Sequence, residues 1–295
     1  MSELKLKARA KINLGLDVIR KREDGYHDLR MVMQTIGLCD ELVLSQVETE
    51  GIFVSTNRPE LPTDERNLVY RAARLLREEF GLPGGIRIHL EKKIPMAAGL
   101  AGGSTDAAAV LKGMNDLYSL GLSEAQLCER GVKLGADIPY CIMGGTALAE
   151  GIGERLTRLP EAPQCSVLLT KPWIDVSTAF VYGHLRADEL QDHPDIDGQI
   201  AAVWSGDFSG MTEKMGNVLE TVTIPAYPVV QEIKEEMLEL GAAGAMMSGS
   251  GPTVFGLFDD REKAEAAYRR MCENGAGRDV FLTEFFQPDG REQDR

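Results

Sequence analysis

Basic residues are scarce in this sequence. Its 295 residues include 46 Asp and Glu but only 32 Lys and Arg, which gives a formal net charge of −14 at pH 7. Proteins bind nucleic-acid polymers and anionic membranes through extended basic surfaces. The charge therefore argues against a nucleic acid or a membrane surface as the partner, although it says little about a small anion held in a cleft.

Long apolar runs and paired metal ligands are also missing. No run approaches the ~18 apolar residues of a membrane helix, and the first residues lack the charged-then-apolar pattern of a signal peptide. The five cysteines include no C-x-x-C pair and the four histidines no H-E-x-x-H pair. Since neither a disulfide framework nor a zinc site is indicated, we expect free thiols in a reducing cytoplasm.

What is present is the composition of a globular protein, with 43% hydrophobic and 26% charged residues. The strand and helix patterns follow no strict βαβ rhythm, which favours an α+β fold. We expect an N-terminal domain over 1–158, a C-terminal domain over 159–286 and a polar tail over 287–295. Strand patterns occupy 4–18, 29–36, 41–47, 86–90, 166–170, 245–258 and 280–285; helix patterns occupy 66–80, 104–118, 123–134, 177–185, 229–240 and 261–274.

The strongest local motif is a Gly- and Ala-rich loop between a strand and a helix. Small residues leave backbone N–H groups uncovered, and a helix N-terminus adds orphan donors and partial positive charge, so the segment can cradle a phosphate. Its composition alone fits a tightly packed loop with a capped helix equally well. Ser104 and Thr105 could cap that helix or bind a phosphate or Mg²⁺, and Asp106 could oppose its dipole, orient a metal-bound water or stabilise its first turn. The motif comprises Pro95, Met96, Ala97, Ala98, Gly99, Leu100, Ala101, Gly102, Gly103, Ser104 and Thr105.

Three separated segments together resemble the GHMP kinases, the small-molecule kinases named for galactose, homoserine, mevalonate and phosphomevalonate. They are Ala10–Leu16, Pro95–Asp106 and Gly244–Phe255, and they occur in the family's order and spacing. The resemblance implies an ATP-dependent phosphotransferase with an alcohol as acceptor. It also implies an N-terminal domain like domain 2 of ribosomal protein S5 and a ferredoxin-like C-terminal domain that close one cleft.

The resemblance assigns the chemistry to Lys11, Asn13 and Asp137. Asp137 matches the catalytic aspartate; it is ionised at pH 7 and could accept the hydroxyl proton. Lys11 could hold Asp137 ionised and stabilise the attacking oxygen, while Asn13 orients the substrate. Without the family, Asp137 reads as a helix-stop residue before Ile138-Pro139 and Lys11 as a strand lysine that reaches solvent.

Further motifs resemble one branch of the family, whose acceptor is the C2 hydroxyl of a cytidine-diphosphate methylerythritol in the non-mevalonate isoprenoid pathway. These motifs are Arg22–His27, Gly135–Pro139 and Val176–Tyr182. The resemblance assigns Tyr26 and Tyr182 to stacking on the cytosine, His27 to its edge and Thr178 to the same pocket. The plainer alternatives are a core aromatic for Tyr182 and a loop histidine for His27.

The remaining expectations concern the nucleotide and the metal. Asn67 could contact adenine or simply cap a helix, and Ser248, Gly249, Ser250 and Gly251 should shape the pocket beside the phosphate loop or form a plain glycine-rich hairpin. Mg²⁺ should accompany ATP, with Ser104 as the best protein ligand and others unknown. The rival functions are another GHMP kinase, acting on homoserine or mevalonate, and a non-catalytic nucleotide-binding module. The oligomeric state is open, with a homodimer as one option.

Overall fold

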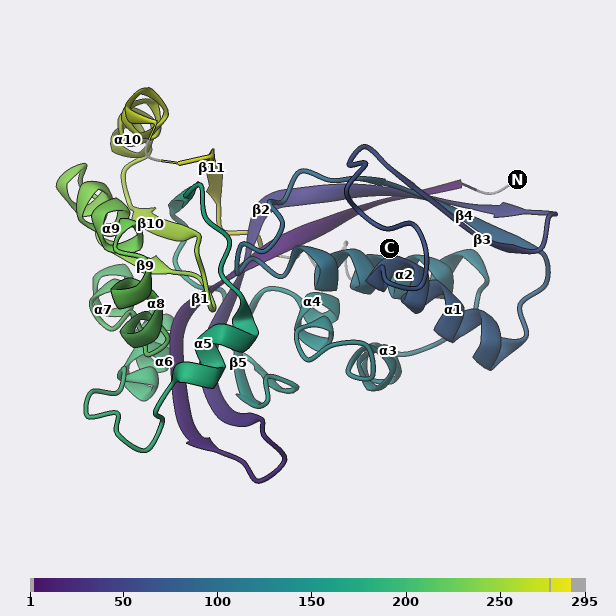
Figure 1. The fold of residues 1–295 in the computed structure, drawn as a ribbon, viewed down its shortest axis with the longest axis horizontal. Coiled ribbons are helices and arrows are strands. Elements are labelled where there is room, and N and C mark those ends of the chain that lie inside the picture. The colour runs from purple at the N-terminus through teal and green to yellow at the C-terminus, as the bar shows by residue number, and fades with distance from the viewer. Residues whose placement is uncertain (1–2, 276, 288–295) are drawn as a thin grey trace.

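The protein is described by a computed structural model that covers residues 3–275 and 277–287 (Figure 1). A long twisted sheet with helices on one face fills one end of the molecule, and a smaller sheet with its own helices fills the other. Within the described residues, no helix is both long enough and apolar enough to cross a membrane. Most of the polar tail expected over 287–295 lies outside the described residues.

The N-terminal sheet has seven strands in the order β3-β4-β2-β1-β8, with β5 paired to β2 and β6 to β5. Its central pair, β1 and β2, is antiparallel, and β8 adds to β1 in parallel from far along the chain. The strands are β1 (Glu3–Lys21), β2 (His27–Val47), β3 (Gly51–Thr56), β4 (Gly85–Glu91), β5 (Thr146–Gly151), β6 (Arg155–Arg158) and β8 (Gly216–Asn217).

β1 and β2 form a long ribbon that runs through the large sheet and curves toward the C-terminal part of the molecule (Figure 1). β1 alternates between exposed and inward residues near its start and is then buried on both faces from Ala10 to Val18. Its register shifts three times, between Arg9 and Lys11, Asn13 and Gly15, and Val18 and Arg20. Such bulges bend a strand and re-aim its side chains. The expectation of separate strands over 29–36 and 41–47 is wrong, because β2 continues between them.

Four helices cover one face of this sheet (Figure 1). Their apolar faces and the inward side of β1–β4 enclose one core, with α1 contributing Val69, Ala72 and Leu76. α3 begins with a capping box between Ser123 and Gln126 and ends three residues before the predicted Leu134. The helices are α1 (Leu68–Phe80), α2 (Gly102–Leu117), α3 (Glu124–Gly131) and α4 (Ile138–Met143).

The C-terminal sheet has four antiparallel strands in the order β11-β7-β10-β9. Numbered along the chain this order is 4-1-3-2, with helices after the first and third strands, which is the ferredoxin-like arrangement expected above. The expected strand over 245–258 is two strands joined by a glycine-rich turn. The strands are β7 (Ser166–Lys171), β9 (Gly244–Met247), β10 (Val254–Phe258) and β11 (Asp279–Glu284).

Short helices link β7 to β9, and sequence periodicity predicted only the first and last of them. Of the others, the helices over 208–213 and 220–226 span only six and seven residues, and the ten-residue helix over 196–205 has no marked apolar stripe. These helices and the final one are α5 (Thr178–His184), α6 (Ile196–Ser205), α7 (Phe208–Glu213), α8 (Glu220–Ala226), α9 (Val229–Glu239) and α10 (Arg261–Asn274).

The mixed α+β class is confirmed, whereas the boundary between residues 158 and 159 stays a prediction. Residues 159–165, with Pro160 and Pro163, contain no helix or strand. Two of the three hydrophobic cores, however, combine side chains from both sides of that boundary; Leu16 and Leu168, for example, share one core. Burial of the β1–β2 ribbon by the C-terminal part brings the two halves together around one cleft.

Candidate active site

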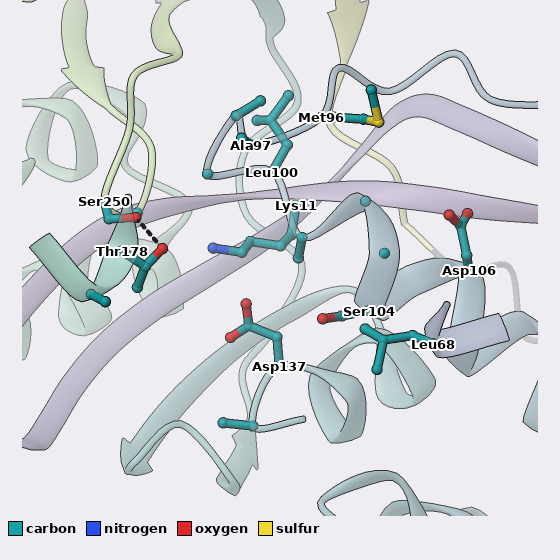
Figure 2. Close-up of a pocket in the computed structure, with 18 of the residues that line it drawn as sticks. Lys11, Leu68, Met96, Ala97, Leu100, Ser104, Asp106, Asp137, Thr178 and Ser250 are labelled. Atoms are coloured by element: carbon teal, nitrogen blue, oxygen red, sulfur yellow. Dashed lines mark hydrogen bonds between the residues drawn. The ribbon is translucent and has the colours of Figure 1, made fainter. Parts of the chain in front are cut away.

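One cavity of about 850 Å³ lies where the β1–β2 ribbon, the phosphate loop and α5 meet. We use the term phosphate loop for residues 93–101, between β4 and α2. The cavity collects the predicted residues Lys11, Asn13, Tyr26, His27, Asn67, Asp137, Thr178, Tyr182, Gly249 and Ser250, and the motif from Pro95 to Ser104. Figure 2 shows Lys11 from β1, Asp137 from the start of α4 and Ser104 from α2 around the same space.

The phosphate loop has a conformation that normally requires glycine. Ala97, Gly99 and Ala101 have φ values of 49°, 73° and 56°. The left-handed region is disfavoured for alanine, so the surrounding structure must hold the loop in place. Ala101 in this conformation is the N-cap, and α2 therefore begins at Gly102, two residues before the predicted start at Ser104. Ser104 is thus within the first turn and is not the cap.

Contacts from both halves of the chain anchor the loop. The Ser248 hydroxyl donates to the Gly99 carbonyl at 3.0 Å, and the Lys11 N–H donates to the Leu100 carbonyl at 3.2 Å. A side chain at Gly99 would place its Cβ 2.0 Å from the Ser248 carbonyl oxygen, so only glycine fits there. The Thr105 hydroxyl donates to the Arg9 carbonyl at 2.7 Å. Thr105 and Ser248 therefore lie outside the cavity lining and support the loop from behind.

Lys11 and Asn13 are buried neighbours on the ribbon. Lys11 is 5% exposed, and its Nζ donates to Asn13 Oδ1 at 2.7 Å. The Asn13 amide in turn donates to the Met31 sulfur at 3.4 Å. The alternative in which Lys11 reaches bulk solvent is wrong, because the bulges on either side of it turn the ammonium into the cavity.

Asp137 stands at the N-cap position of α4 and makes no side-chain capping bond there. Pro139 occupies the first turn, where proline is tolerated because its missing N–H has no helical partner. The alternative reading as a helix-stop residue is wrong, since Asp137 precedes a helix and ends none. Its carboxylate is thereby left to face the cavity beside Lys11 (Figure 2).

Part of the cavity lining is aromatic, with His27, Tyr26 and Tyr182. His27 is 6% exposed, and its ring centroid lies 5.2 Å from that of Tyr182, with the planes tilted by 38°. Burial, with a smaller effect of nearby Lys21, lowers the pKa of His27. His27 Nε2 has no hydrogen-bond partner among the described residues, so the neutral ring can bond a ligand. Tyr26 is 59% exposed at the rim.

Hydrogen bonds join the third motif to the phosphate loop and to α5. The Thr178 and Ser250 hydroxyls share a hydrogen bond of 2.8 Å (Figure 2). Gly249 has a φ of 57°, and a Cβ there would lie 3.5 Å from Lys11 Nζ. Gly251 does not line the cavity; it completes the turn with a φ of 85°. The third motif is thus the wall of the cavity beside Lys11.

Asn67 is the N-cap of α1, which is one of the two roles that the sequence left open for it. Its Oδ1 accepts from the Val69 N–H at 2.9 Å, and its Nδ2 donates to the Pro62 carbonyl at 2.8 Å. Asn67 also lines the cavity. The capping role is confirmed, and contact with adenine stays a prediction.

Two contacts that support the cavity wall were not predicted from the sequence. Asn217 donates through Nδ2 to the carbonyls of Met247 and Gly249, both at 2.8 Å, and so shapes the third motif. Asp106, for which the sequence left three roles open, accepts through Oδ2 from Lys92 Nζ at 2.7 Å, a contact that none of the three included. An asparagine in a two-residue strand and a lysine at a strand end give no sequence signal for these partners.

The described residues contain no group of three or more His, Cys, Asp and Glu side chains able to hold a metal ion. Ser104 lines the cavity near Asp137 and is the nearest hydroxyl on α2 that could contribute an oxygen. A divalent ion here would have to take most of its ligands from phosphates and water.

Comparison with known proteins gives the family. The GHMP kinase N-terminal domain matches residues 67–145 and the GHMP kinase C-terminal domain matches residues 200–277. A protein of Lachnospira eligens, "4-diphosphocytidyl-2-C-methyl-D-erythritol kinase", is 53% identical over 98% of this chain and 100% of its own length. The chain belongs to the GHMP kinase family. It is accordingly a small-molecule kinase that uses ATP.

Other GHMP kinases support the assignment of the chain to this family. The Enterococcus faecalis "4-diphosphocytidyl-2-C-methyl-D-erythritol kinase" is 49% identical over 94% of this chain and 96% of its own length. A crystal structure of a 4-(cytidine 5'-diphospho)-2C-methyl-D-erythritol kinase superposes with a TM-score of 0.83 at 35% identity, covering 96% of this chain and all of the other. A homoserine kinase from Cytophaga hutchinsonii, at 21% identity and a TM-score of 0.77 over 96% of this chain and 94% of its own, shares the fold.

Proposed function

We propose that this GHMP kinase transfers the γ-phosphoryl group of ATP to the C2 hydroxyl of 4-diphosphocytidyl-2-C-methyl-D-erythritol, in the non-mevalonate route to isoprenoid precursors. The observation that carries the proposal is one cavity whose lining combines the phosphate loop, Lys11 and Asp137 with His27, Tyr26 and Tyr182. The names of the relatives at about half identity point to the same substrate.

At the phosphoryl end, the chain supplies positioning and charge. Backbone N–H groups of the phosphate loop and of the first turn of α2 face the phosphates, with the partial positive charge of the helix N-terminus behind them. The Asp137 carboxylate accepts the hydrogen bond of the substrate hydroxyl and takes its proton as the bond to phosphorus forms. Lys11, held by Asn13, stabilises the negative charge on the attacking oxygen.

We include Mg²⁺ in the proposal, since bound to ATP it would neutralise phosphate charge. Ser104 would be its protein contact, and the lack of an acidic cluster among the described residues fits an ion held mainly by the nucleotide.

At the cytidine end, ring stacking and one buried nitrogen supply selectivity. Tyr26 and Tyr182 offer faces on which any base could stack, so they give affinity with little discrimination. His27 Nε2 is buried without a partner among the described residues, and a base that failed to bond it would leave it unsatisfied. Thr178, tied to Ser250, completes this part of the pocket.

The proposal is tested by following ADP release with Mg²⁺ and ATP while the acceptor is varied. We expect turnover with the cytidyl substrate and none with homoserine or mevalonate. Turnover of homoserine or mevalonate alone would assign the chain to another branch of the family. Binding of ATP and the cytidyl substrate without ADP formation would favour the non-catalytic module.

Replacing Tyr182 with Ala should weaken the cytidyl substrate far more than ATP. Loss of one stacking face costs about 1–3 kcal/mol, which corresponds to a rise in KM for that substrate of roughly fivefold to 160-fold. Tyr182→Phe is the matched control, because it keeps the ring face and should keep KM near the wild-type value. Equal losses for both substrates in Tyr182→Ala would show that the residue is structural.

Two sequence predictions accompany the proposed activity, a division into two domains between residues 158 and 159 and a cytoplasmic location, while the oligomeric state is open, with a homodimer as one option. Analytical ultracentrifugation would decide between monomer and dimer.

A further inference from the structure

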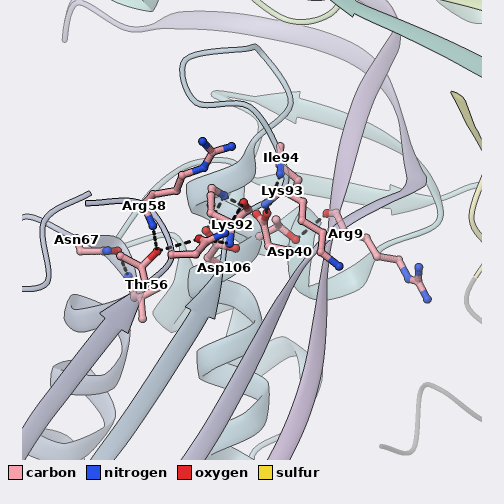
Figure 3. A network of polar contacts seen from close by, with 12 residues as sticks. Arg9, Asp40, Thr56, Arg58, Asn67, Lys92, Lys93, Ile94 and Asp106 are labelled. Carbon is pink, nitrogen blue, oxygen red and sulfur yellow. Dashed lines mark hydrogen bonds and ion pairs between the residues drawn. The ribbon is translucent and has the colours of Figure 1, made fainter. Parts of the chain in front are cut away.

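A buried cluster of three charged side chains joins the two ends of the phosphate loop (Figure 3). Lys92, directly after β4, donates through Nζ to Oδ2 of Asp106 on α2 and to Oδ2 of Asp40 on β2. Asp40 Oδ1 also accepts from the backbone N–H groups of Lys93 and Ile94, the latter at 2.8 Å. The side chains of Lys92, Asp40 and Asp106 are 4%, 0% and 3% exposed.

Ionisation of both carboxyl groups of this cluster is unfavourable at this place. Two carboxylates share one ammonium, so the cluster carries one excess negative charge when both are ionised, and Lys92 and Asp106 line the cavity that would receive a polyanion. Asp106 Oδ1 is buried without a hydrogen-bond partner among the described residues. Burial raises the pKa of Asp106 to about 8; Lys92 counters this only in part, and the nearby Asp40 adds to it, so ionising the second carboxyl beside the first is costly. Asp40 and Lys92 alone would form a neutral pair, so stability does not account for Asp106.

The position of Asp106 in the chain explains the presence of this carboxyl better than stability does. Lys92 and Asp106 are 14 residues apart and enclose the whole phosphate loop, so their ion pair closes the base of that loop. A Cβ at Gly102 would lie 2.8 Å from Lys92 Nζ, which shows how closely the ammonium passes under the start of α2. The loop between them contains Ala97 and Ala101 at positive φ, a conformation that persists only when the surroundings enforce it.

We propose that Asp106 is a positioning residue: through Lys92 it holds the base of the phosphate loop in the shape that binds ATP. The proposal rests on the nucleotide site proposed above and is independent of the identity of the acceptor. Asp40 fixes the strand end of the loop, Asp106 fixes the helix end, and Lys92 sets the separation between them. The loop N–H groups then point to the phosphates before ATP arrives.

The test compares Asp106→Ala, Asp106→Asn and the control Asp116→Ala, an exposed carboxylate on the same helix. ATP affinity is measured by titration calorimetry and stability by thermal unfolding. Because small misplacements of binding groups cost up to about a hundredfold, we expect Asp106→Ala to weaken ATP by about tenfold or more, at a melting temperature no lower than that of the wild type. Asp106→Asn keeps an oxygen for Lys92 and should restore most of the affinity, and Asp116→Ala should match the wild type.

A double-mutant cycle with Lys92→Met separates action through Lys92 from direct contact with the nucleotide. In the Lys92→Met background, Asp106→Ala should have much less effect than in the wild type; additive losses would overturn the proposal. Wild-type ATP affinity in Asp106→Ala would also overturn the proposal, as would failure of Asp106→Asn to restore binding. A lower binding stoichiometry and melting temperature at unchanged affinity would show instead that Asp106 only stabilises the fold, which overturns the proposal as well. Since ATP binding is the readout, these outcomes are distinct from failure to phosphorylate the cytidyl substrate.

Discussion

Replacing Asp137 with Ala should abolish turnover while leaving the affinity for ATP nearly unchanged. A positioned general base contributes roughly 10²–10⁴-fold to rate, and kcat should fall by about that factor. The carboxylate makes no capping bond to α4, so its removal takes no hydrogen bond from the helix. Steady-state ADP release gives kcat, and calorimetric titration with ATP gives the affinity.

The specificity of that result depends on the fold staying intact. Two controls test this. The melting temperature of Asp137→Ala should lie within a few degrees of the wild type, and Asp116→Ala, which also loses one carboxylate, should be active. Wild-type kcat in Asp137→Ala would remove the residue from proton transfer. A large loss of ATP affinity would instead place its carboxylate in nucleotide binding.

Replacing Lys11 with Met should have the second large effect. The variant keeps an unbranched apolar stem in a buried position but removes the charge that Asn13 orients. Loss of one preorganised donor to a developing negative charge costs roughly 10²–10³-fold in kcat. We expect kcat to fall by that factor, with a smaller change in KM for either substrate, in the same ADP-release assay.

Lys5→Met is the matched control, since Lys5 is exposed on the same strand and lies far from the cavity lining. It should leave kcat unchanged. If Lys11→Met retained more than half of the wild-type kcat, the ammonium would have no part in the reaction. If its main effect were on KM for ATP, Lys11 would act on bound phosphates in the ground state.

Local sequence signals predicted most of the elements, whereas the functional residues now found in the cavity lining were predicted from the family resemblance. The strand before the phosphate loop and the helix after it lie within two residues of where periodicity placed them, and α3 begins close to its predicted start with a capping box between Ser123 and Gln126. The start of α2 was misplaced because Ala101, with no side-chain cap and a positive φ, carries no recognisable cap signal. α7 and α8 were missed because a segment of six or seven residues shows too little periodicity, and the ten-residue α6 was missed because its apolar residues form no marked stripe.

Pairings between distant residues could not be read from the chain. Asp40 and Lys92 are 52 residues apart, and Thr178 and Ser250 are 72 apart. Each residue taken alone has an ordinary explanation as a strand charge or a loop hydroxyl, and only the paired strands and the closed cleft bring them together. The contact of Asn217 could not be predicted from the chain either. Its amide reaches the Met247 carbonyl of the third motif only because β8 pairs with β1.

The sequence by itself determined the family, the phosphate loop and the residue types of both ends of the cavity. These depend on composition within a few consecutive residues, and three motifs in order are enough to recognise them. The tertiary structure decided which of these residues face one another, how an alanine-containing loop is held at positive φ, and why Asp106 is buried beside Lys92. The physical reason is that desolvation and charge pairing depend on distance in space, and that distance is set by the β1–β2 ribbon and the packing of two sheets around it.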